Sequence, residues 1–317
     1  MYKQTVFYSH ADFAMHDTGM GHPESAARLA VIEQALAGPE FAGLLRRAPE
    51  MAADVENLLS LVHGESHIAK VFASVPREGG LAYLDADTPV SPGSLHAALL
   101  AVSAACQAVA AVCGGGAERA FCALRPPGHH AEPERAMGFC LFNNAAIAAM
   151  VARVRLGLRR VAIVDFDVHH GNGTQAAFYD DPSVMYVSSH QWPHYPGGGR
   201  ESEIGAGNIV NLPLPAGAGG AEMLSAYRLR AWPAVRAFSP ELLIVSAGFD
   251  AHRDDPLAGL HLSAADYYAL TADLCVLADE CAEGRLVSVL EGGYCLPALA
   301  DSVAEHVRAL IGLPALG

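Results

Sequence analysis

The most informative segment of the chain for its fold is Val161-Ala162-Ile163-Val164-Asp165-Phe166-Asp167-Val168-His169. Its first four residues form a continuous apolar run, which is typical of a strand buried on both faces of a parallel sheet. The polar residues that follow stand at i, i+2 and i+4, so in an extended chain Asp165, Asp167 and His169 project to one face. The stretch therefore predicts a buried strand with a polar site at its carboxyl end.

Similar apolar runs recur along the chain and alternate with longer helical patterns. The runs predict strands at Thr5–Tyr8, Arg119–Leu124, Val161–Asp165, Val184–Ser188, Leu242–Ser246 and Leu286–Leu290. The longer patterns predict helices at Pro23–Ala37, Pro92–Val112, Asn143–Leu156, Ala221–Phe238, Ala264–Glu283 and Leu296–Ile311. We expect Pro23 in a first helical turn. This alternation predicts an α/β fold in which helices cover both faces of a central, mostly parallel sheet.

Four of the expected strands run directly into polar clusters. These clusters are Arg125–His130, Asp165–Gly173, Ala247–His252 and Glu291–Tyr294. In open α/β sheets, ligands bind outside the carboxyl ends of the strands, so we expect the four clusters to converge on one crevice. Because no repeat, low-complexity tract or linker divides the chain, we expect one domain over residues 1–317.

The composition of the 317 residues excludes several classes of protein. Hydrophobic residues make up 52% and charged residues 17%, which excludes disorder and coiled coil. A formal net charge of −14 repels phosphate backbones and anionic lipid, so we expect no direct nucleic-acid or membrane binding. No apolar run reaches the roughly 18 residues of a membrane span. The first five residues lack the apolar stretch that a secretory signal requires.

The seven cysteines are an odd number, and no two of them form a C-x-x-C pair. Five lie in apolar or Ala-rich surroundings: Cys106, Cys113, Cys122, Cys140 and Cys275. We interpret these as small buried hydrophobes in a reducing compartment, not as a disulfide framework. The cysteine pattern therefore predicts a cytoplasmic protein.

Asp167 and His169 are candidate metal ligands, and Asp250, which follows another expected strand, is the natural third. Two carboxylates and an imidazole suit Zn²⁺, with Fe²⁺ or Co²⁺ as substitutes, and three protein ligands leave a position open for a catalytic water. The alternative is a buried salt-bridge cluster or a strand-end cap, and for Asp250 alone a helix or turn cap. Buried carboxylates need a cationic partner in either case.

His129 and His130 follow a loop that two prolines stiffen. One histidine is a candidate general base, and the other an electrostatic partner or an acid for the leaving group. Asp165 and Asn172 are the candidate partners that fix the tautomers of the two rings. The alternative is a pair of structural histidines that cap a loop.

Three aromatic residues are further candidates for this crevice. Tyr294 follows two glycines, and a phenol beside a metal can donate a hydrogen bond to a developing oxyanion. Phe139, after Gly138, and Tyr195 are candidate walls for a narrow apolar substrate. The alternative for all three aromatic residues is ordinary packing at a strand end, in the core or in a loop.

Five runs taken together resemble the zinc-dependent histone deacetylase superfamily, including its class II-like bacterial amidohydrolases. The runs are Arg125–His130, Gly138–Asn144, Asp165–Gly173, Ala247–Asp250 and Glu291–Tyr294. The similarity extends from His22-Pro23-Glu24, with Arg28, to the last expected helix, so it covers nearly the whole chain. The resemblance implies an arginase/deacetylase-like fold of one domain, and hydrolysis of an acetyl or other acyl group from an amine.

The resemblance also implies a role for each site residue. It makes Asp167, His169 and Asp250 the ligands of one zinc ion per chain, and Tyr294 the group that polarises the amide carbonyl and binds the oxyanion. The substrate tunnel is implied to include Gly138, Phe139, Tyr195 and Leu257. Tyr195 replaces the Phe that is usual at its position.

The two histidines take different roles in this resemblance. His130 is implied to be the general base, and His129, oriented by Asp165, is its largely electrostatic neighbour or an acid. Asn172 is the partner of His130, where many members of the family have Asp. Because Asn stabilises an imidazolium less than a carboxylate does, we expect a lower pKa for His130 here.

The resemblance further implies structural potassium near the strand that carries the zinc ligands. Its ligands would be Asp165, Ser188 and backbone carbonyls around Phe178 and Asp181. The expected substrate is an acylated lysine in a peptide or protein, or an acetylated polyamine. The oligomeric state is open, a homo-oligomer included.

Three other functions compete with an acyl-lysine hydrolase. The first is an acetylpolyamine amidohydrolase. Leu257 stands where one polyamine-selective branch of the family carries Glu, and a leucine there favours an acyl-lysine substrate. The acidic net charge, together with Asp254 and Asp255 near Leu257, favours a polycationic substrate instead. The second is an arginase-type ureohydrolase, which needs two Mn²⁺ ions and more Asp ligands. The third is a non-catalytic acyl-ligand-binding protein, which predicts the loss of a ligand, a histidine or Tyr294.

Overall fold

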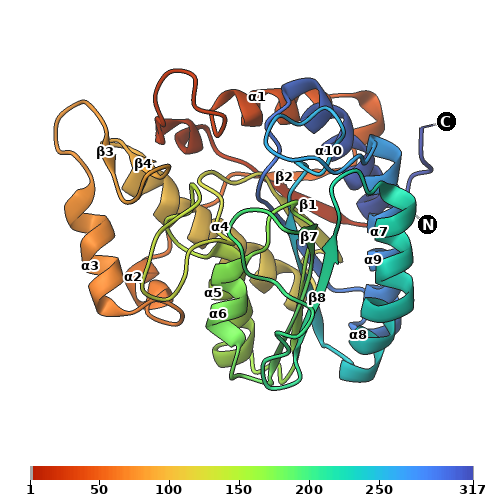
Figure 1. Cartoon of the computed structure of the whole chain (residues 1–317). Coiled ribbons are helices and arrows are strands. Elements are labelled where there is room, and N and C mark those ends of the chain that lie inside the picture. Colours follow the sequence, from red (N-terminus) through yellow and green to blue (C-terminus); the bar gives the residue numbers. More distant parts are fainter. Residues whose placement is uncertain (1–2, 317) are drawn as a thin grey trace.

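An eight-stranded sheet forms the centre of the computed structural model, which describes residues 3–316 (Figure 1). Its strands are β1 (Thr5–Tyr8), β2 (Leu45–Arg47), β5 (Arg119–Cys122), β6 (Val161–Asp165), β7 (Val184–Gln191), β8 (Ile209–Leu214), β9 (Leu242–Ala247) and β10 (Leu286–Leu290). The strand order is β2-β1-β5-β10-β9-β6-β7-β8, and all neighbours are parallel. The prediction of an α/β fold with a central parallel sheet is confirmed.

The strand β6, which begins the segment Val161–His169, lies inside the sheet between β9 and β7. All five of its residues are fully buried, as a parallel strand covered on both faces requires. Its register places Ser188 of β7 and Ser246 of β9 beside Asp165. The carboxyl ends of these three strands therefore open at the same edge of the sheet.

The sequence predicts six of the eight strands, three of them with the observed bounds, and misses β2 and β8. These two strands are the edges of the sheet. β2 is three residues long, and Asn211 and Pro213 interrupt the apolar pattern of β8. Proline is tolerated in β8 because an edge strand has a partner on one side alone. A small antiparallel hairpin, β3 (Ala82–Tyr83) and β4 (Pro89–Val90), is also missed.

Helices cover both faces of the sheet (Figure 1). One face carries α4 (Ser94–Cys113), α5 (Asn144–Val154) and α6 (Asn172–Phe178), with α2 (Val55–Leu59) and α3 (Glu65–Ser74) beyond them. The other face carries α1 (Ala27–Ala35), α7 (Gly220–Ala226), α8 (Trp232–Phe238), α9 (Ala264–Cys281) and α10 (Leu296–Ile311). Two short 3-10 segments, Ala11–Met15 and Pro39–Phe41, belong to the connections.

Two expected helices differ from the structure. The first begins at Ala27 instead of Pro23, because the preceding segment carries Glu24 into a buried contact with Arg125. The helix expected at 221–238 is divided into α7 and α8 by a π-helical turn over Tyr227–Ala231. Pro233 has no N–H to donate to the preceding turn, which explains the wider turn at this point.

Helix α4 contradicts the expectation that no segment has the length and apolar composition of a membrane span. This helix is 20 residues long, and an 18-residue window of it is apolar enough to cross a membrane by length and composition alone. Two-thirds of that window (67%) is buried inside the protein. The apolar side chains of α4 pack against α5 and the sheet, so its composition is explained by the core.

The cysteines agree with the expectation of unpaired, small hydrophobes. Within residues 3–316 all seven are free thiols. Cys106, Cys122, Cys140 and Cys275 are buried, whereas Cys113 is half-buried. Burial in this apolar core raises the pKa of the Cys122 thiol well above its usual value, which leaves it unreactive.

Candidate active site and metal centre

The four strand ends that carry polar clusters meet at one edge of the sheet. β5, β10, β9 and β6 are consecutive neighbours, and all run in the same direction. The loops after them carry the expected crevice residues His129, His130, Tyr294, Asp250, Asp167 and His169. The predicted convergence on one crevice is therefore confirmed.

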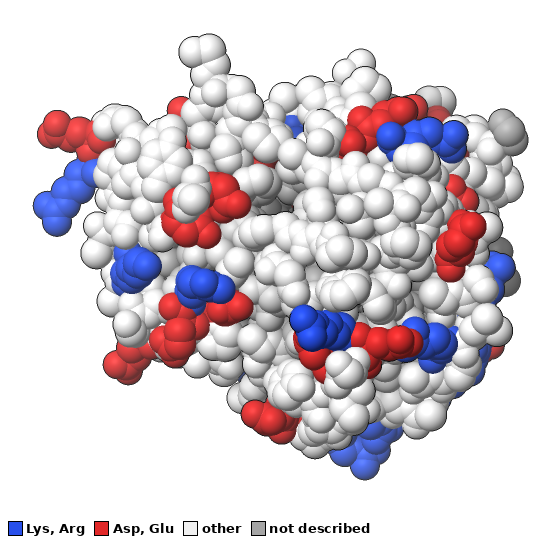
Figure 2. Space-filling view, viewed as in Figure 1, with Lys and Arg blue, Asp and Glu red and all other residues white. Residues whose placement is uncertain are grey.

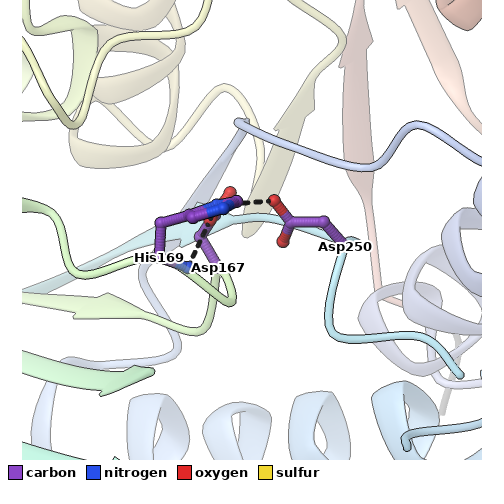
Figure 3. Close-up of side chains that lie close together, drawn as sticks. All are labelled: Asp167, His169 and Asp250. Carbon is purple, nitrogen blue, oxygen red and sulfur yellow. Dashed lines mark hydrogen bonds and ion pairs between the residues drawn. The ribbon is translucent and has the colours of Figure 1, made fainter. Parts of the chain in front are cut away.

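Asp167, His169 and Asp250 come together as a candidate metal site (Figure 3). The Nδ1 atom of His169 lies 3.0 Å from Asp167 Oδ1 and 3.1 Å from Asp250 Oδ2. One ligand atom from each residue lies within 4.8 Å of the others, and all three residues are buried. The second carboxylate oxygens accept bonds from the backbone, Asp167 Oδ2 from Gly292 N and Asp250 Oδ1 from Val168 N. One oxygen of each carboxylate is thereby directed at the imidazole.

The charge of this triad fits a bound cation. Burial and the Asp167 carboxylate raise the pKa of Asp250 to about 7. Burial alone lowers the pKa of His169, but the two carboxylates outweigh it and raise the value to about 10. The site thus has surplus negative charge that a proton on the ring offsets in part. Zn²⁺ suits the same place, because two carboxylates and an imidazole are among its preferred ligands.

Two glycines let the backbone approach the candidate metal site. A Cβ atom on Gly248, after β9, would overlap the Asp167 carboxylate. A Cβ atom on Gly292, after β10, would overlap the carboxylates of Asp250 and Asp167. At both positions glycine is required because no other residue leaves enough space for the neighbouring carboxylates.

His129 is held by a buried carboxylate, as the sequence predicts. Its Nδ1 atom lies 3.0 Å from Asp165 Oδ2, which also accepts the Tyr186 hydroxyl at 2.9 Å. Its Nε2 atom lies 3.8 Å from Asp167 Oδ1. Although burial lowers the pKa of His129, the charges of Asp165 and Asp167 raise it well above its usual value. The ring is therefore held as an imidazolium in this geometry.

His130 has the opposite electrostatic character. Its Nδ1 atom lies 2.8 Å from Asn172 Oδ1, and the Asn172 amide nitrogen donates to Glu132 Oε1 at 2.7 Å. Because a carboxylate can only accept, Glu132 turns the Asn172 oxygen toward the ring, and His130 Nδ1 is the donor. Burial and the neighbouring rings of His129 and His169 lower the pKa of His130 well below its usual value. The ring is neutral, with Nε2 free to accept a proton.

Glu132 and Glu291 are site residues that sequence reasoning missed. Glu291 Oε2 accepts the backbone N–H groups of Gly128 (2.7 Å) and His129 (3.1 Å), and Ser246 donates to its other oxygen at 3.0 Å. A carboxylate that supports a loop through hydrogen bonds belongs to no helical or strand periodicity, so the pattern of the sequence does not reveal it. The presence of Glu291 in the Glu-Gly-Gly-Tyr run is the one indication that the sequence offers.

Tyr294 is held from behind by a buried arginine and an aspartate. The Arg28 guanidinium carbon lies 5.1 Å from the centre of the tyrosine ring, and Arg28 Nε donates to Gly293 O at 2.7 Å. Asp255 Oδ2 accepts the backbone N–H of Tyr294 at 2.6 Å. Burial and the nearby Asp250 carboxylate raise the pKa of the Tyr294 phenol well above its usual value. The phenol therefore keeps its proton and can act as a hydrogen-bond donor.

A pocket with a volume of about 200 Å³ opens above the triad. The four residues expected in the tunnel, Gly138, Phe139, Tyr195 and Leu257, all line it. His194, next to Tyr195, also lines the pocket, and sequence reasoning missed one further lining residue, Asp87. Phe139 has a φ of +69°, which turns its ring into the pocket wall at 5.8 Å from the Tyr294 ring, measured between centres. A Cβ atom on Gly138 would lie 2.5 Å from His130, so glycine is required beside the imidazole.

The expected potassium ligands do not meet at one point. Ser188 pairs with Asp165, whereas Val184, next to the Phe178–Asp181 turn, pairs with Val161 at the other end of β6. The two places are four residue steps apart along β6, which corresponds to about 13 Å at about 3.3 Å per residue. One ion cannot contact both groups, so the residues implied by the resemblance lie at two separate places, and potassium at either place stays a prediction.

Comparisons with known proteins agree with this fold and site. The histone deacetylase domain family matches residues 22–310. The solved structure titled HDA15 HD domain superposes with a TM-score of 0.91 at 34% identity, covering 99% of this chain and 91% of that one. Fold and site thus define a hydrolase of the deacetylase class. The chain belongs to the histone deacetylase family.

The relatives include proteins from plants and bacteria. Histone deacetylase 10, chloroplastic, of Oryza sativa is 39% identical over 96% of this chain and 72% of its own length. An uncharacterized protein of Synechocystis is 41% identical over 96% of this chain and 99% of its own length. The histone deacetylase-like amidohydrolase of Pseudomonas aeruginosa is 42% identical over 79% of this chain and 66% of its own length.

Proposed function

We propose that this protein is a zinc-dependent amidohydrolase that removes acetyl or other acyl groups from lysine side chains. The observation that carries the proposal is the convergence of His130 and Tyr294 on one narrow, aromatic-lined pocket that also contains His169. An acyl-lysine side chain is long, thin and mostly apolar, which suits a pocket of this kind.

Asp167, His169 and Asp250 are the residues that would hold the zinc ion. Such an ion supplies a Lewis acid for a carbonyl oxygen and lowers the pKa of water toward neutrality. The buried carboxylate surplus described above supports this assignment. The buried Asp165 carboxylate and the neighbouring Ser188 are, in turn, the remaining candidates for the structural potassium site.

In this proposal His130 transfers a proton from the attacking water to the amine that leaves. Its Nε2 atom is unprotonated at neutral pH, so it can accept a proton from the attacking water. The same atom then returns the proton to the amine nitrogen as the carbon–nitrogen bond breaks. His129, fixed by Asp165, adds a positive charge beside the developing oxyanion without itself exchanging a proton.

Tyr294 stabilises the oxyanion from the opposite wall. Its phenol donates to the oxygen of the scissile amide, where negative charge develops when water adds to the carbonyl carbon. Phe139 and Tyr195 flank the alkyl chain and exclude bulk water. The products are a carboxylic acid and an amine, which leaves as a cation at neutral pH.

A specific observation favours a second candidate function, the deacetylation of polyamines. Asp87 lines the pocket, and its backbone N–H donates to the Asp85 carboxylate at 3.1 Å. Burial and the Asp85 charge raise the pKa of Asp87, so this pair of carboxylates would gain from a nearby cation. Asp255, by contrast, is turned inward onto the backbone of Tyr294 and faces no substrate.

Steady-state kinetics on two substrate classes tests the proposal. We expect higher kcat/KM for an acetyl-lysine peptide than for an N-acetylated polyamine, and loss of both activities after chelation. Preference for the polyamine, abolished in Asp87→Asn but kept in the exposed control Asp254→Asn, would establish the second candidate instead. Two metal ions per chain would favour a ureohydrolase, and a zinc-loaded protein without turnover would favour a binding protein.

A further inference from the structure

The strongest unexplained feature outside the active site is a cradle of three backbone carbonyls around Asn208. Asn208 is buried and directly precedes β8, the edge strand beside β7. Its amide nitrogen Nδ2 donates to Phe178 O at 2.8 Å, Asp181 O at 3.0 Å and Val184 O at 2.7 Å. We refer to these three carbonyls as the carbonyl cradle.

The carbonyl cradle has the chemistry of a site for a monovalent cation. Convergent backbone carbonyl oxygens can replace the hydration shell of such an ion, as they do in potassium-selective filters. The turn that carries them is closed by its own backbone bonds, from Asp181 N to Phe178 O and from Val184 N to Asp181 O. The second lone pairs of these oxygens remain directed at a common point, and Asn208 Nδ2 stands at that point.

We infer that the Asn208 side chain replaces a bound cation in this protein. An ion and the amide nitrogen cannot share one position, so the residues present do not fit the potassium that the family resemblance implies at Phe178 and Asp181. The amide performs the same structural task through hydrogen bonds. It ties the end of α6 and the start of β7 to β8, and the backbone carbonyl of Asn208 also accepts Tyr186 N at 2.9 Å.

The competing arrangement has Asn208 turned so that its oxygen joins the three carbonyls around a cation. In the part of the chain that the structure describes, Asn208 Oδ1 is buried and has no hydrogen-bond partner. Two amide hydrogens are also shared among three carbonyls. The two arrangements differ in what occupies the cradle, so the occupant itself must be measured.

Anomalous diffraction from wild-type crystals grown in rubidium or thallium salts identifies the occupant. We expect no anomalous peak within contact distance of the three carbonyl oxygens in the wild-type protein. A peak there would overturn the inference, whatever the activity of the crystals. A peak near Asp165 and Ser188 in the same crystals would show that the soak can label a buried site.

Thermal unfolding of an Asn208→Ala variant provides the second test. In tetramethylammonium chloride we expect a lower Tm than wild type, because the cradle has lost its donor. Replacing that salt by KCl at equal ionic strength should raise the Tm of the variant several degrees more than that of wild type. An equal rise in both proteins would contradict the inference.

Asn211→Ala is the matched control for this experiment. Asn211 is a buried residue of β8 whose amide donates to Gln175 Oε1 at 2.8 Å and to two carbonyls at 3.3 Å, away from the carbonyl cradle. It should lower the Tm without a potassium-specific recovery. If Asn208→Ala does not fold, the anomalous diffraction of wild type decides by itself.

Discussion

At the scale of single residues, the protonation of His130 is controlled by what lies behind it. Asn172 presents an oxygen to His130 Nδ1 because Glu132 holds the amide nitrogen. A neutral amide stabilises an imidazolium less than a carboxylate would. Together with burial and two neighbouring rings, this keeps the pKa of His130 low and its Nε2 free.

The first prediction tests this control with a carboxylate behind His130. Asn172→Asp, made in a Glu132→Gln background so that the new charge has an amide partner, should raise the pKa of His130. A general base must be unprotonated, so the acid limb of the kcat/KM profile should move to higher pH. Glu132→Gln alone is the control. Superimposable profiles for the two variants would show that residue 172 does not set the protonation of the base.

The second prediction concerns the phenol of Tyr294. Tyr294→Phe removes the proposed oxyanion donor and keeps the ring against Phe139 and Arg28. We expect kcat to fall by about 10²–10³-fold, the usual effect of losing one such donor, with little change in KM. Zinc content, measured in parallel, should stay at one ion per chain. Undiminished kcat at full zinc content would remove Tyr294 from the mechanism.

At the scale of elements, the site depends on how closely neighbouring strand ends approach. Gly248 and Gly292 follow β9 and β10, and a side chain at either would enter the space of the ligand carboxylates. The third prediction is that Gly248→Ala displaces Asp167 and lowers zinc affinity by about 10–100-fold, as losses of ligand support typically do. Competition with a chromophoric chelator measures the affinity.

Gly259→Ala is the control for that variant. Its added Cβ atom would meet its nearest neighbours at 3.4 Å and 3.7 Å, which is ordinary contact. We expect wild-type zinc affinity for this control. Equal affinity in Gly248→Ala and wild type would mean that the strand-end spacing tolerates a methyl group.

The elements also show where sequence patterns stop being informative. β1, β6 and β10 lie inside the sheet, and their bounds follow from apolar runs that burial on both faces requires. The edge strand β8 contains Asn211 and Pro213, so its pattern is mixed. The π-helical turn at Tyr227–Ala231 depends on one missing N–H donor inside an otherwise regular helical pattern.

At the scale of the whole molecule, buried neutral histidines couple stability to pH. His306 is fully buried, with Nδ1 2.7 Å from Thr271 Oγ1 and Nε2 2.9 Å from Ser288 Oγ. Burial lowers its pKa to about 3, and burial likewise lowers the pKa of His63 to about 3. A histidine in the unfolded chain has a pKa of about 6.5. Below that pH the unfolded state therefore binds protons at these histidines, whereas the folded state does not until the pH approaches 3.

The fourth prediction follows from this difference. The stability that these two histidines contribute is complete above about pH 6.5 and is lost as the pH falls toward 3, by up to about 1.4 kcal/mol per pH unit for each group. Urea unfolding at pH 7.5, 6.5 and 5.5 measures the slope. His306→Gln, which keeps a polar side chain between the two hydroxyls, should give a shallower slope. Identical slopes would contradict the role of His306.

On the face of the molecule that Figure 2 shows, the charged side chains do not form one acidic patch. Acidic and basic side chains alternate there around a largely uncharged centre. Long-range attraction of cations by a charge of −14 is screened within about 8 Å at physiological salt. Selection of a cationic substrate would therefore depend on local groups such as Asp87 at the pocket.

Short-range patterns in the sequence were sufficient to predict the central parallel strands, the candidate metal ligands Asp167, His169 and Asp250, and the family. These patterns are the apolar runs, the i, i+2, i+4 spacing and the ordered motifs. Three contacts can be found in the folded protein alone: Glu132 orients Asn172, Glu291 supports the His129 loop, and Asn208 fills the carbonyl cradle. Each of these is a hydrogen bond between residues far apart along the chain. Such partners are selected by how the loops pack, which no local pattern encodes.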